Sequence, residues 1–257
     1  MKLNPRQQRI LEEINTQTFV SVEYLSQLFD VAAQTIRRDI TQLCDLGLAR
    51  RHHGGAGPLP SAQNISFGAR QVLNAGAKRA IAREIAAAIP DNASIAMGIG
   101  TTVEAVAREL QEHRGLKILT NNLNVASQFF SSSHTQVLVS GGALRPQDQD
   151  MVGQSVVEFF NSYHCDYAII GVGALDSQRG LMDYDTDNVQ ITQSILQNAA
   201  KCWLAVDASK WSKKAFANVA PLRAVHRVFS DSLPESEIID RAEAAGTIFT
   251  ICHEEHL

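Results

Sequence analysis

Cysteine is scarce in this chain, and its spacing argues against two common kinds of scaffold. Four cysteines occur among 257 residues, and no CxxC pair or Cys/His cluster is present. Zinc modules and disulfide frameworks need closely spaced or paired cysteines. We therefore expect no metal site, and we expect the thiols to be small buried apolar groups.

Long apolar segments are also missing. The longest apolar runs, residues 81–89 and 167–175, are too short or too polar to span a bilayer. The N-terminal sequence MKLNPRQQRI has no apolar core of the kind found in secretion signals. With 45% apolar and 19% charged residues, the composition is typical of a folded soluble protein. We expect a cytoplasmic protein without a membrane partner.

Charge is unevenly distributed along the chain, whose net charge is −4. Residues 1–60 contain seven Lys/Arg and six Asp/Glu residues, which leaves 16 basic and 21 acidic residues for the remainder. The segment Gln34–His53 has four basic residues, two acidic residues and two histidines. Such a patch indicates a nucleic-acid contact, although a solvated helical face beside an unrelated loop gives the same pattern.

Three short helices are predicted in the first sixty residues. Asn4-Pro5 and Ser21 are typical helix starts. A third helix is predicted from about Ala33 to Leu46, and Gly47 ends it. Since the LARRHHGG sequence that follows favours a short hairpin or wing, the segment is predicted to be a winged helix-turn-helix.

The third predicted helix has one apolar and one polar face. Ile36, Ile40 and Leu43 recur at helical spacing and form the apolar face. The adjacent Arg37 and Arg38 are therefore expected on the outward face. An exposed polar face can enter the DNA major groove, where arginine binds guanine or phosphate. The predicted DNA-binding residues are Gln34, Thr35, Arg37, Arg38, Thr41, Arg50, Arg51, His52 and His53.

The segment QTIRRDITQLCDLGLARRHHGGA resembles the signature of the DeoR-type bacterial transcriptional regulators. That family usually has a Ser-Pro pair at the start of the recognition helix, where this chain has Ala32-Ala33. Loss of a serine cap costs about 1 kcal/mol. The resemblance implies a homodimer or homotetramer that represses transcription from double-stranded operator DNA.

The rest of the chain alternates short apolar strands with helical patterns. Residues 54–64 are rich in glycine and proline and favour a linker, so we predict a DNA-binding domain at 1–57, a linker at 58–76 and an effector-binding domain at 77–257. The alternation predicts an α/β fold with a largely parallel sheet and helices on both faces. The predicted strands are Ser94–Met97, Lys117–Thr120, Gln136–Ser140, Tyr167–Val172, Cys202–Val206, Arg227–Ser230 and Thr247–Ile251.

Glycine, serine and threonine are frequent where these strands end, which is where parallel sheets bind ligands. Glycine turns at helix starts attract phosphate, and a lysine beside them suits an anion. No complete GxGxxG is present, so we expect no nicotinamide and no other cofactor. The predicted effector-binding residues are Gly98, Gly100, Thr101, Thr102, Thr120, Asn121, Asn122, Gly141, Gly142, Gly171, Gly173, Asp176 and Lys210.

The family resemblance continues through this second region. It is similar to the sensor domain of DeoR-type regulators, itself similar to sugar-phosphate isomerases such as ribose-5-phosphate isomerase. The resemblance implies that the GTT, TNN, SGG and DASK sequences line a pocket for a phosphorylated metabolite. Two departures concern this pocket: Gly98 replaces a common aspartate, and Asn188, Gln190 and Gln193 are neutral where relatives carry charges.

An isomerase would need a carboxylate base near the pocket. Four aspartates are candidates, and each is also explained as a turn cap or an ion-pair partner: Asp176, Asp183, Asp185 and Asp207. We therefore predict no catalytic residue. The predicted function is a transcriptional repressor of a carbohydrate or glycerol-phosphate catabolic operon, released by a phosphorylated metabolite such as glycerol-3-phosphate. The alternative is a sugar-phosphate isomerase-like enzyme fused to a DNA-binding domain.

Overall fold

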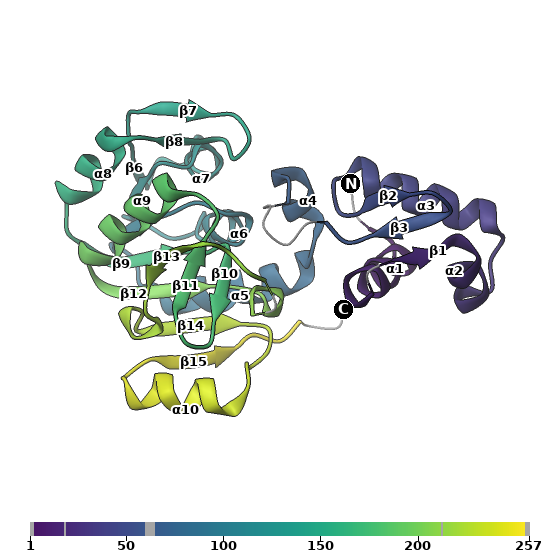
Figure 1. Ribbon diagram of the computed structural model, residues 1–257. Coiled ribbons are helices and arrows are strands. Elements are labelled where there is room, and N and C mark those ends of the chain that lie inside the picture. The colour runs from purple at the N-terminus through teal and green to yellow at the C-terminus, as the bar shows by residue number, and fades with distance from the viewer. Residues whose placement is uncertain (1–2, 18, 60–64, 212, 255–257) are drawn as a thin grey trace. The chain divides into compact units, whose positions relative to one another are not determined.

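The computed structural model describes residues 3–17, 19–59, 65–211 and 213–254. Two compact units divide the chain, Met1–Asn74 and Ala75–Leu257. Figure 1 shows a small unit of helices with a narrow sheet and a larger α/β unit. Residues 60–64, which belong to the predicted linker, lie outside the described residues.

The N-terminal unit is built from three helices, a small antiparallel sheet in the strand order β1-β3-β2, and a fourth, short helix. Its elements are α1 (Pro5–Thr16), β1 (Val20–Ser21), α2 (Val22–Phe29), α3 (Ala33–Asp45), β2 (Arg50–His52), β3 (Gly55–Gly57) and α4 (Phe67–Val72).

Local sequence explains where these helices begin. Asn4 and Gln7 form a capping box at the start of α1, and the Ser21 side chain accepts a hydrogen bond from the Tyr24 N–H at the start of α2. Ala32 precedes α3 and supplies no capping side chain. The side chains of Ile10, Ile14, Leu25, Ile36 and Leu43 are fully buried and hold the three helices together. The predicted winged helix-turn-helix is confirmed.

A helix lies inside the predicted linker range. In α4, Ala69 is fully buried and belongs to the hydrophobic core of the N-terminal unit. The Ser66 hydroxyl, which precedes this helix, donates to the Leu46 carbonyl at 3.2 Å. The described part of 58–76 therefore includes ordered structure that the glycine and proline content did not indicate, and the domain limits drawn from the sequence stay predictions.

The C-terminal unit centres on a parallel sheet. Its strands and helices, in chain order, are α5 (Ala75–Ala88), β4 (Ser94–Met97), α6 (Thr101–Glu109), β5 (Lys117–Thr120), α7 (Leu123–Ser127), β6 (Gln136–Val139), β7 (Ala143–Arg145), β8 (Asp150–Val152), α8 (Gln154–Asn161), β9 (Cys165–Ile170), β10 (Ala174–Asp176), β11 (Gly180–Asp183), α9 (Thr186–Gln197), β12 (Ala199–Ala205), β13 (Ala217–Ala220), β14 (Arg227–Ser230), α10 (Ser236–Ala244) and β15 (Ile248–Ile251).

Within the described residues, seven strands form the main sheet in the order β15-β14-β12-β9-β4-β5-β6, and every neighbouring pair is parallel. These are the seven predicted strands, so the α/β prediction is confirmed. The chain builds outward from β4 in one direction and then from β9 in the other. The boundary between β4 and β9 is therefore the topological switch point, beside which parallel sheets commonly bind ligands.

Alternate residues of the strands enter two separate hydrophobic cores. Ile95 and Met97 of β4 join one core, and Ala96 between them joins the other. The first core includes Ile81 and Ile85 of α5, and the second includes residues of α8 and α9. Helices therefore cover both faces of the sheet, as predicted.

Two small antiparallel assemblies, which the sequence did not indicate, are attached to the sheet. The hairpin of β7 and β8 follows β6, and β10, β11 and β13 form a separate three-stranded sheet after β9. Both follow strands at their carboxyl ends. In the part of the chain that the structure covers, no helix is long and apolar enough to cross a membrane.

Candidate functional site

The polar face of α3 is exposed, as its helical spacing predicts. Gln34, Arg37 and Arg38 are exposed, and Thr35 is half-buried near the start of the helix. Ile36 and Ile40 lie on the opposite side and are buried. This geometry leaves both arginines able to reach a DNA groove or phosphate.

The wing is joined to α3 by a hydrogen bond. The Arg51 guanidinium donates to the Thr41 hydroxyl, which itself donates to the Arg37 carbonyl at 2.7 Å. The His52 ring packs edge-on against Phe19, with 6.1 Å between ring centroids. Of the predicted DNA-binding residues, Thr41 and Arg51 are therefore brought together, while Arg50, His52 and His53 are exposed on the wing.

A buried polar network beneath α3 was missed from the sequence. The carboxylate of Asp39, which is 4% exposed, accepts from Arg6 Nε at 2.6 Å and from Gln7 Nε2 at 3.2 Å. Gln7 also donates to Gln42. This network joins α1 to the buried side of α3. The helical spacing indicates that Asp39 is buried, because position 39 falls on the same face of the helix as Ile36 and Leu43.

Several predicted effector residues lie in loops at the carboxyl ends of adjacent strands. Residues 98–100 follow β4, Asn121 and Asn122 follow β5, and residues 140–142 follow β6. On the other side of the switch point, residues 171–173 follow β9, and Lys210 lies in the 3-10 turn Ala208–Lys210 after β12. The parallel strand order therefore gathers these loops along one edge of the sheet.

Two of the predicted polar residues form hydrogen bonds that stabilise the loop itself. The Thr120 hydroxyl donates to the Met97 carbonyl at 2.8 Å and accepts from the Asn122 N–H at 3.0 Å. The Asn122 side-chain oxygen Oδ1 caps α7 by accepting from the N–H groups of Asn124 and Val125, and its Nδ2 donates to Glu104 at 3.3 Å. These two residues stabilise the loop after β5, because their side chains form hydrogen bonds within the protein.

Two buried side-chain oxygens in the same loops lack a hydrogen-bond partner among the described residues. They are Asn121 Oδ1 and Ser140 Oγ, and both residues are at most 3% exposed. Asn121 Nδ2 does have a partner, because it donates to the Met151 carbonyl at 2.9 Å. Buried polar atoms without a partner are rare in folded proteins and indicate water or ligand contacts.

Glycine is required at two of the predicted positions by packing. A Cβ at Gly173 would lie 2.8 Å from the Tyr184 ring, and one at Gly142 (φ 131°) would lie 2.7 Å from the Val152 carbonyl. At Gly98, by contrast, a Cβ would meet Ile195 at 3.6 Å, which is ordinary contact. Gly98 therefore has room for a Cβ atom.

The predicted residues Asp176 and Lys210 lie in different surroundings. Asp176 is exposed at the turn between β10 and β11, where the N–H groups of Arg179 and Gln178 donate to it and lower the pKa of its carboxyl. Lys210 Nζ donates to the Gly173 carbonyl at 3.4 Å. Asp183, with 8% exposure, has a pKa raised by burial, which the N–H groups of Tyr184 and Asp185 and the charge of Lys210 partly oppose.

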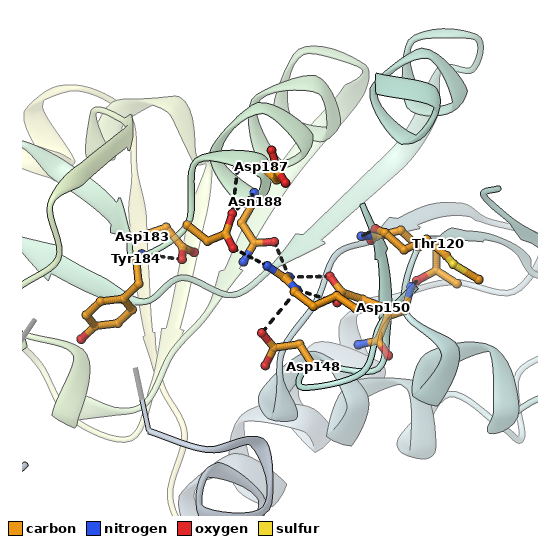
Figure 2. Close-up of polar contacts among 12 residues, drawn as sticks. Thr120, Asp148, Asp150, Asp183, Tyr184, Asp187 and Asn188 are labelled. Carbon is orange, nitrogen blue, oxygen red and sulfur yellow. Dashed lines mark hydrogen bonds and ion pairs between the residues drawn. The ribbon is translucent and has the colours of Figure 1, made fainter. Parts of the chain in front are cut away.

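Arg145 forms the centre of a second polar cluster, shown in Figure 2. Its guanidinium forms two hydrogen bonds to Asp150, at 3.0 and 2.6 Å, and one to Asp185 at 2.6 Å. It also donates to Asn188 Oδ1 at 2.7 Å and lies 3.6 Å from Asp148. Burial raises the pKa of Asp150, while Arg145 lowers it.

All four carboxylates considered for isomerase chemistry have structural hydrogen-bond partners. Asp176 caps a turn, Asp185 caps α9 and binds Arg145, and Asp207 accepts from the Ser209 N–H at 3.1 Å. Asp183 accepts from the Tyr184 N–H at 2.7 Å and differs from the other three in being a buried carboxylate whose pKa is raised by burial, a feature typical of functional sites. No group of three or more potential metal ligands occurs in the described portion of the chain.

Asp183→Asn is expected to raise the melting temperature at pH 8, because the variant avoids burying a charged carboxylate. Since the folded-state pKa lies above the ordinary value of 3.8, the charged form destabilises the native state at high pH, and this penalty disappears as the pH falls toward 3.8. Thermal unfolding from pH 8 down to about pH 4 should show a gain that shrinks as the pH approaches 3.8.

Asp176→Asn is the matched control for this prediction. Because the pKa of Asp176 is lowered, its charged form stabilises the native state, and the substitution should lower the melting temperature at pH 8. An equal loss of stability in both variants at pH 8 would contradict the assignment of Asp183 as a destabilising carboxylate.

Both halves of the chain match known protein families. Residues 6–61 match the DeoR-like helix-turn-helix domain, and residues 73–232 match the DeoR C terminal sensor domain. The first match covers α1 to β3, and the second begins before α5 and extends past β14.

Close relatives cover nearly the whole chain. The HTH-type transcriptional repressor CsqR of Escherichia coli is 36% identical over 93% of this chain and 92% of its own. The glycerol-3-phosphate regulon repressor of Haemophilus influenzae is 36% identical over 98% of both chains, and that of Escherichia coli is 35% identical over 93% of this chain and 95% of its own.

Solved structures give a more distant likeness. Ribose 5-phosphate isomerase A of Methanocaldococcus jannaschii aligns with 52% of this chain and 53% of its own, at 17% identity and a TM-score of 0.38. A likeness at this level carries no argument about chemistry.

Proposed function

The chain belongs to the DeoR family of DNA-binding transcriptional repressors, and we propose that it controls a carbohydrate or glycerol-phosphate catabolic operon and leaves its operator when a phosphorylated metabolite binds. The exposed face of α3 reads the operator. The loops at the carboxyl edge of the main sheet bind the metabolite.

One observation carries the effector assignment. Loops from β4, β5, β6, β9 and β12 gather around the switch point of the sheet, and two of them contain the unpartnered buried oxygens of Asn121 and Ser140. Such an edge with convergent polar groups is the usual ligand site of a parallel sheet. The relatives named glycerol-3-phosphate regulon repressors support a phosphorylated three-carbon compound as the first candidate.

The backbone at the start of α6 supports one of the contacts to the phosphate. The helix α6 begins after Gly100, a residue with φ 119° and no side chain to cap the first turn. Backbone N–H groups at a helix start bind phosphate, and the helix dipole adds to the attraction. Thr101 and Thr102 lie in this first turn, and Lys210 supplies positive charge from the loop after β12.

Binding changes DNA affinity only if the metabolite prefers one of two protein arrangements. We expect the protein to act as a homodimer or homotetramer, because winged helices read paired half-sites at a fixed spacing. The metabolite-bound arrangement then holds the two α3 helices at a spacing that fits the operator poorly.

Calorimetry with phosphorylated and unphosphorylated compounds tests the effector assignment. Glycerol-3-phosphate and the pentose and hexose phosphates are compared with glycerol and the free sugars, and binding is expected only in the phosphorylated set. Lys210→Ala should weaken it about 10-fold, since a hydrogen bond to a charged group contributes about 1.5 kcal/mol.

Lys201→Ala is the control for this substitution. Lys201 is an exposed lysine near the amino end of β12, whereas Lys210 follows the carboxyl end of that strand, so the loss of Lys201 removes the same charge away from the loops. Equal weakening by both substitutions, or the absence of binding across all phosphorylated compounds, would overturn the proposed site.

A further inference from the structure

Arg145 joins two segments that are far apart in sequence. It lies on β7, and one side of its guanidinium holds Asp150 of β8 by two hydrogen bonds. The other side binds Asp185 and Asn188 at the start of α9. Figure 2 shows Asp148, Asp150 and Asn188 converging on this cluster.

The β7–β8 hairpin lies against a loop of the proposed effector site. The Met151 N–H donates to the Asn121 carbonyl at 2.8 Å, and Asn121 Nδ2 donates back to the Met151 carbonyl at 2.9 Å. The Leu123 N–H also donates to the Gln149 carbonyl at 3.0 Å. Arg145 therefore connects the loop after β5, through the hairpin, to α9.

The two carboxylates that hold Arg145 from opposite sides differ in burial. The Asp150 side chain is fully buried and forms a two-point contact, which makes it the fixed partner. The Asp185 side chain is 40% exposed and forms one contact, while its other oxygen already caps α9 by accepting from the Asp187 N–H at 2.8 Å. Because a partly exposed ion pair stabilises a protein little, the contact with Asp185 is the one that opens readily.

The charge around Arg145 restricts how an anion can reach it. Three carboxylates, Asp148, Asp150 and Asp185, lie within 4.0 Å of this single guanidinium. A phosphate added to the cluster would be a fourth anionic group and would be repelled. A phosphate that takes the place of Asp185 leaves the number of anions at the guanidinium unchanged, because the displaced carboxylate moves into water.

We propose that Arg145 is an effector-binding residue whose guanidinium exchanges the Asp185 carboxylate for the phosphate of the metabolite. The exchange rests on the proposed function. It removes one of the two contacts between Arg145 and the start of α9 and leaves the hydrogen bond to Asn188. Binding at the loops is thereby transmitted to a helix that packs in the second core through Ile191 and Ile195. No covalent bond changes in this step, and Asp150 remains bound to Arg145 throughout.

Asp185→Asn tests the exchange because it removes the competing charge and keeps the helix cap, since asparagine caps helices as well as aspartate does. The measured quantity is the glycerol-3-phosphate concentration that half-releases a bound operator duplex, with a pentose or hexose phosphate substituted if it acts more strongly on the wild type. This concentration is expected to fall about 2- to 5-fold, because a weak ion pair no longer competes with the phosphate.

Two further variants make the result specific. Asp187→Asn removes the same charge from the same helical turn at an exposed position, and it measures the general effect of reduced negative charge. Arg145→Lys keeps the positive charge but lacks the planar fork, so it should raise the half-release concentration at least 10-fold. Circular dichroism and operator affinity without metabolite check that each variant is folded.

The direction in which Asp185→Asn changes the half-release concentration distinguishes the exchange from a purely structural ion pair. If Arg145 and Asp185 only stabilise the fold, Asp185→Asn weakens the response or matches Asp187→Asn, and either result overturns the exchange while the proposed effector function stands. If no phosphorylated compound releases the wild-type protein from DNA, both the exchange and the effector function are overturned.

Discussion

The double variant in which alanine replaces both Arg37 and Arg38 is expected to lose nearly all sequence-specific affinity for the operator. Both side chains are exposed on α3, opposite the buried Ile36 and Ile40, so neither contributes to the core. An arginine that binds a base edge contributes about 1–3 kcal/mol, or roughly 5- to 150-fold in affinity, and the effect relaxes specificity at that base. The two losses together should lower the operator affinity more than 100-fold.

Fluorescence anisotropy with operator and unrelated duplexes, at several salt concentrations, measures this prediction. The single variants assign the roles. Loss of a base contact lowers the ratio of operator to unrelated affinity, whereas loss of a phosphate contact weakens both and reduces the salt slope. Arg79→Ala, at an exposed position of α5, is the charge control. Operator affinity that is unchanged in the double variant, with the fold intact, would contradict the assignment of the exposed face of α3 as the DNA-binding surface.

Asp39→Ala is expected to destabilise the N-terminal unit strongly. The substitution leaves Arg6 and Gln7 without their shared acceptor beneath α3. Breaking a fully buried ion pair costs more than a surface pair, but the Arg6 side chain keeps 33% exposure, so a loss of about 2 kcal/mol is expected. For a unit of this size that corresponds to a fall of roughly 10 °C in melting temperature.

Asp45→Ala is the matched control on the same helix. Asp45 is exposed at the last position of α3, where an acidic side chain faces the negative end of the helix dipole. Its removal should leave the melting temperature nearly unchanged. Calorimetric unfolding curves that are the same for both variants would show that the buried network does not hold α3.

The main sheet could be predicted because buried parallel strands are nearly continuous apolar runs. The prediction gave the observed limits of β4, β5 and β14, and it placed the other four strands of that sheet within a few residues. The antiparallel strands carry no such signal. In β7, Ala143 and Leu144 are exposed and Arg145 is held by distant partners, so nothing in three residues distinguishes a strand from a loop.

The candidate site could be predicted only in part, for a related reason. Turn chemistry placed the glycine and hydroxyl residues at strand ends, but Thr120 and Asn122 form hydrogen bonds within the loop that only the folded chain reveals. The pair of Arg145 and Asp185 spans 40 residues and depends on the hairpin, which was not predicted. Asp39 is different, because its burial was not predicted although its helical spacing from Ile36 places it on the apolar face of α3.

A titration of operator DNA with the wild-type protein, repeated with and without glycerol-3-phosphate and the sugar phosphates, tests the central claim most directly. The operator is recovered by selection from random duplexes, and the unphosphorylated compounds are the controls. The apparent Kd is expected to rise about 5- to 150-fold with at least one phosphorylated compound, and with none of its unphosphorylated counterparts. An apparent Kd that stays the same across the whole phosphorylated set would contradict the account.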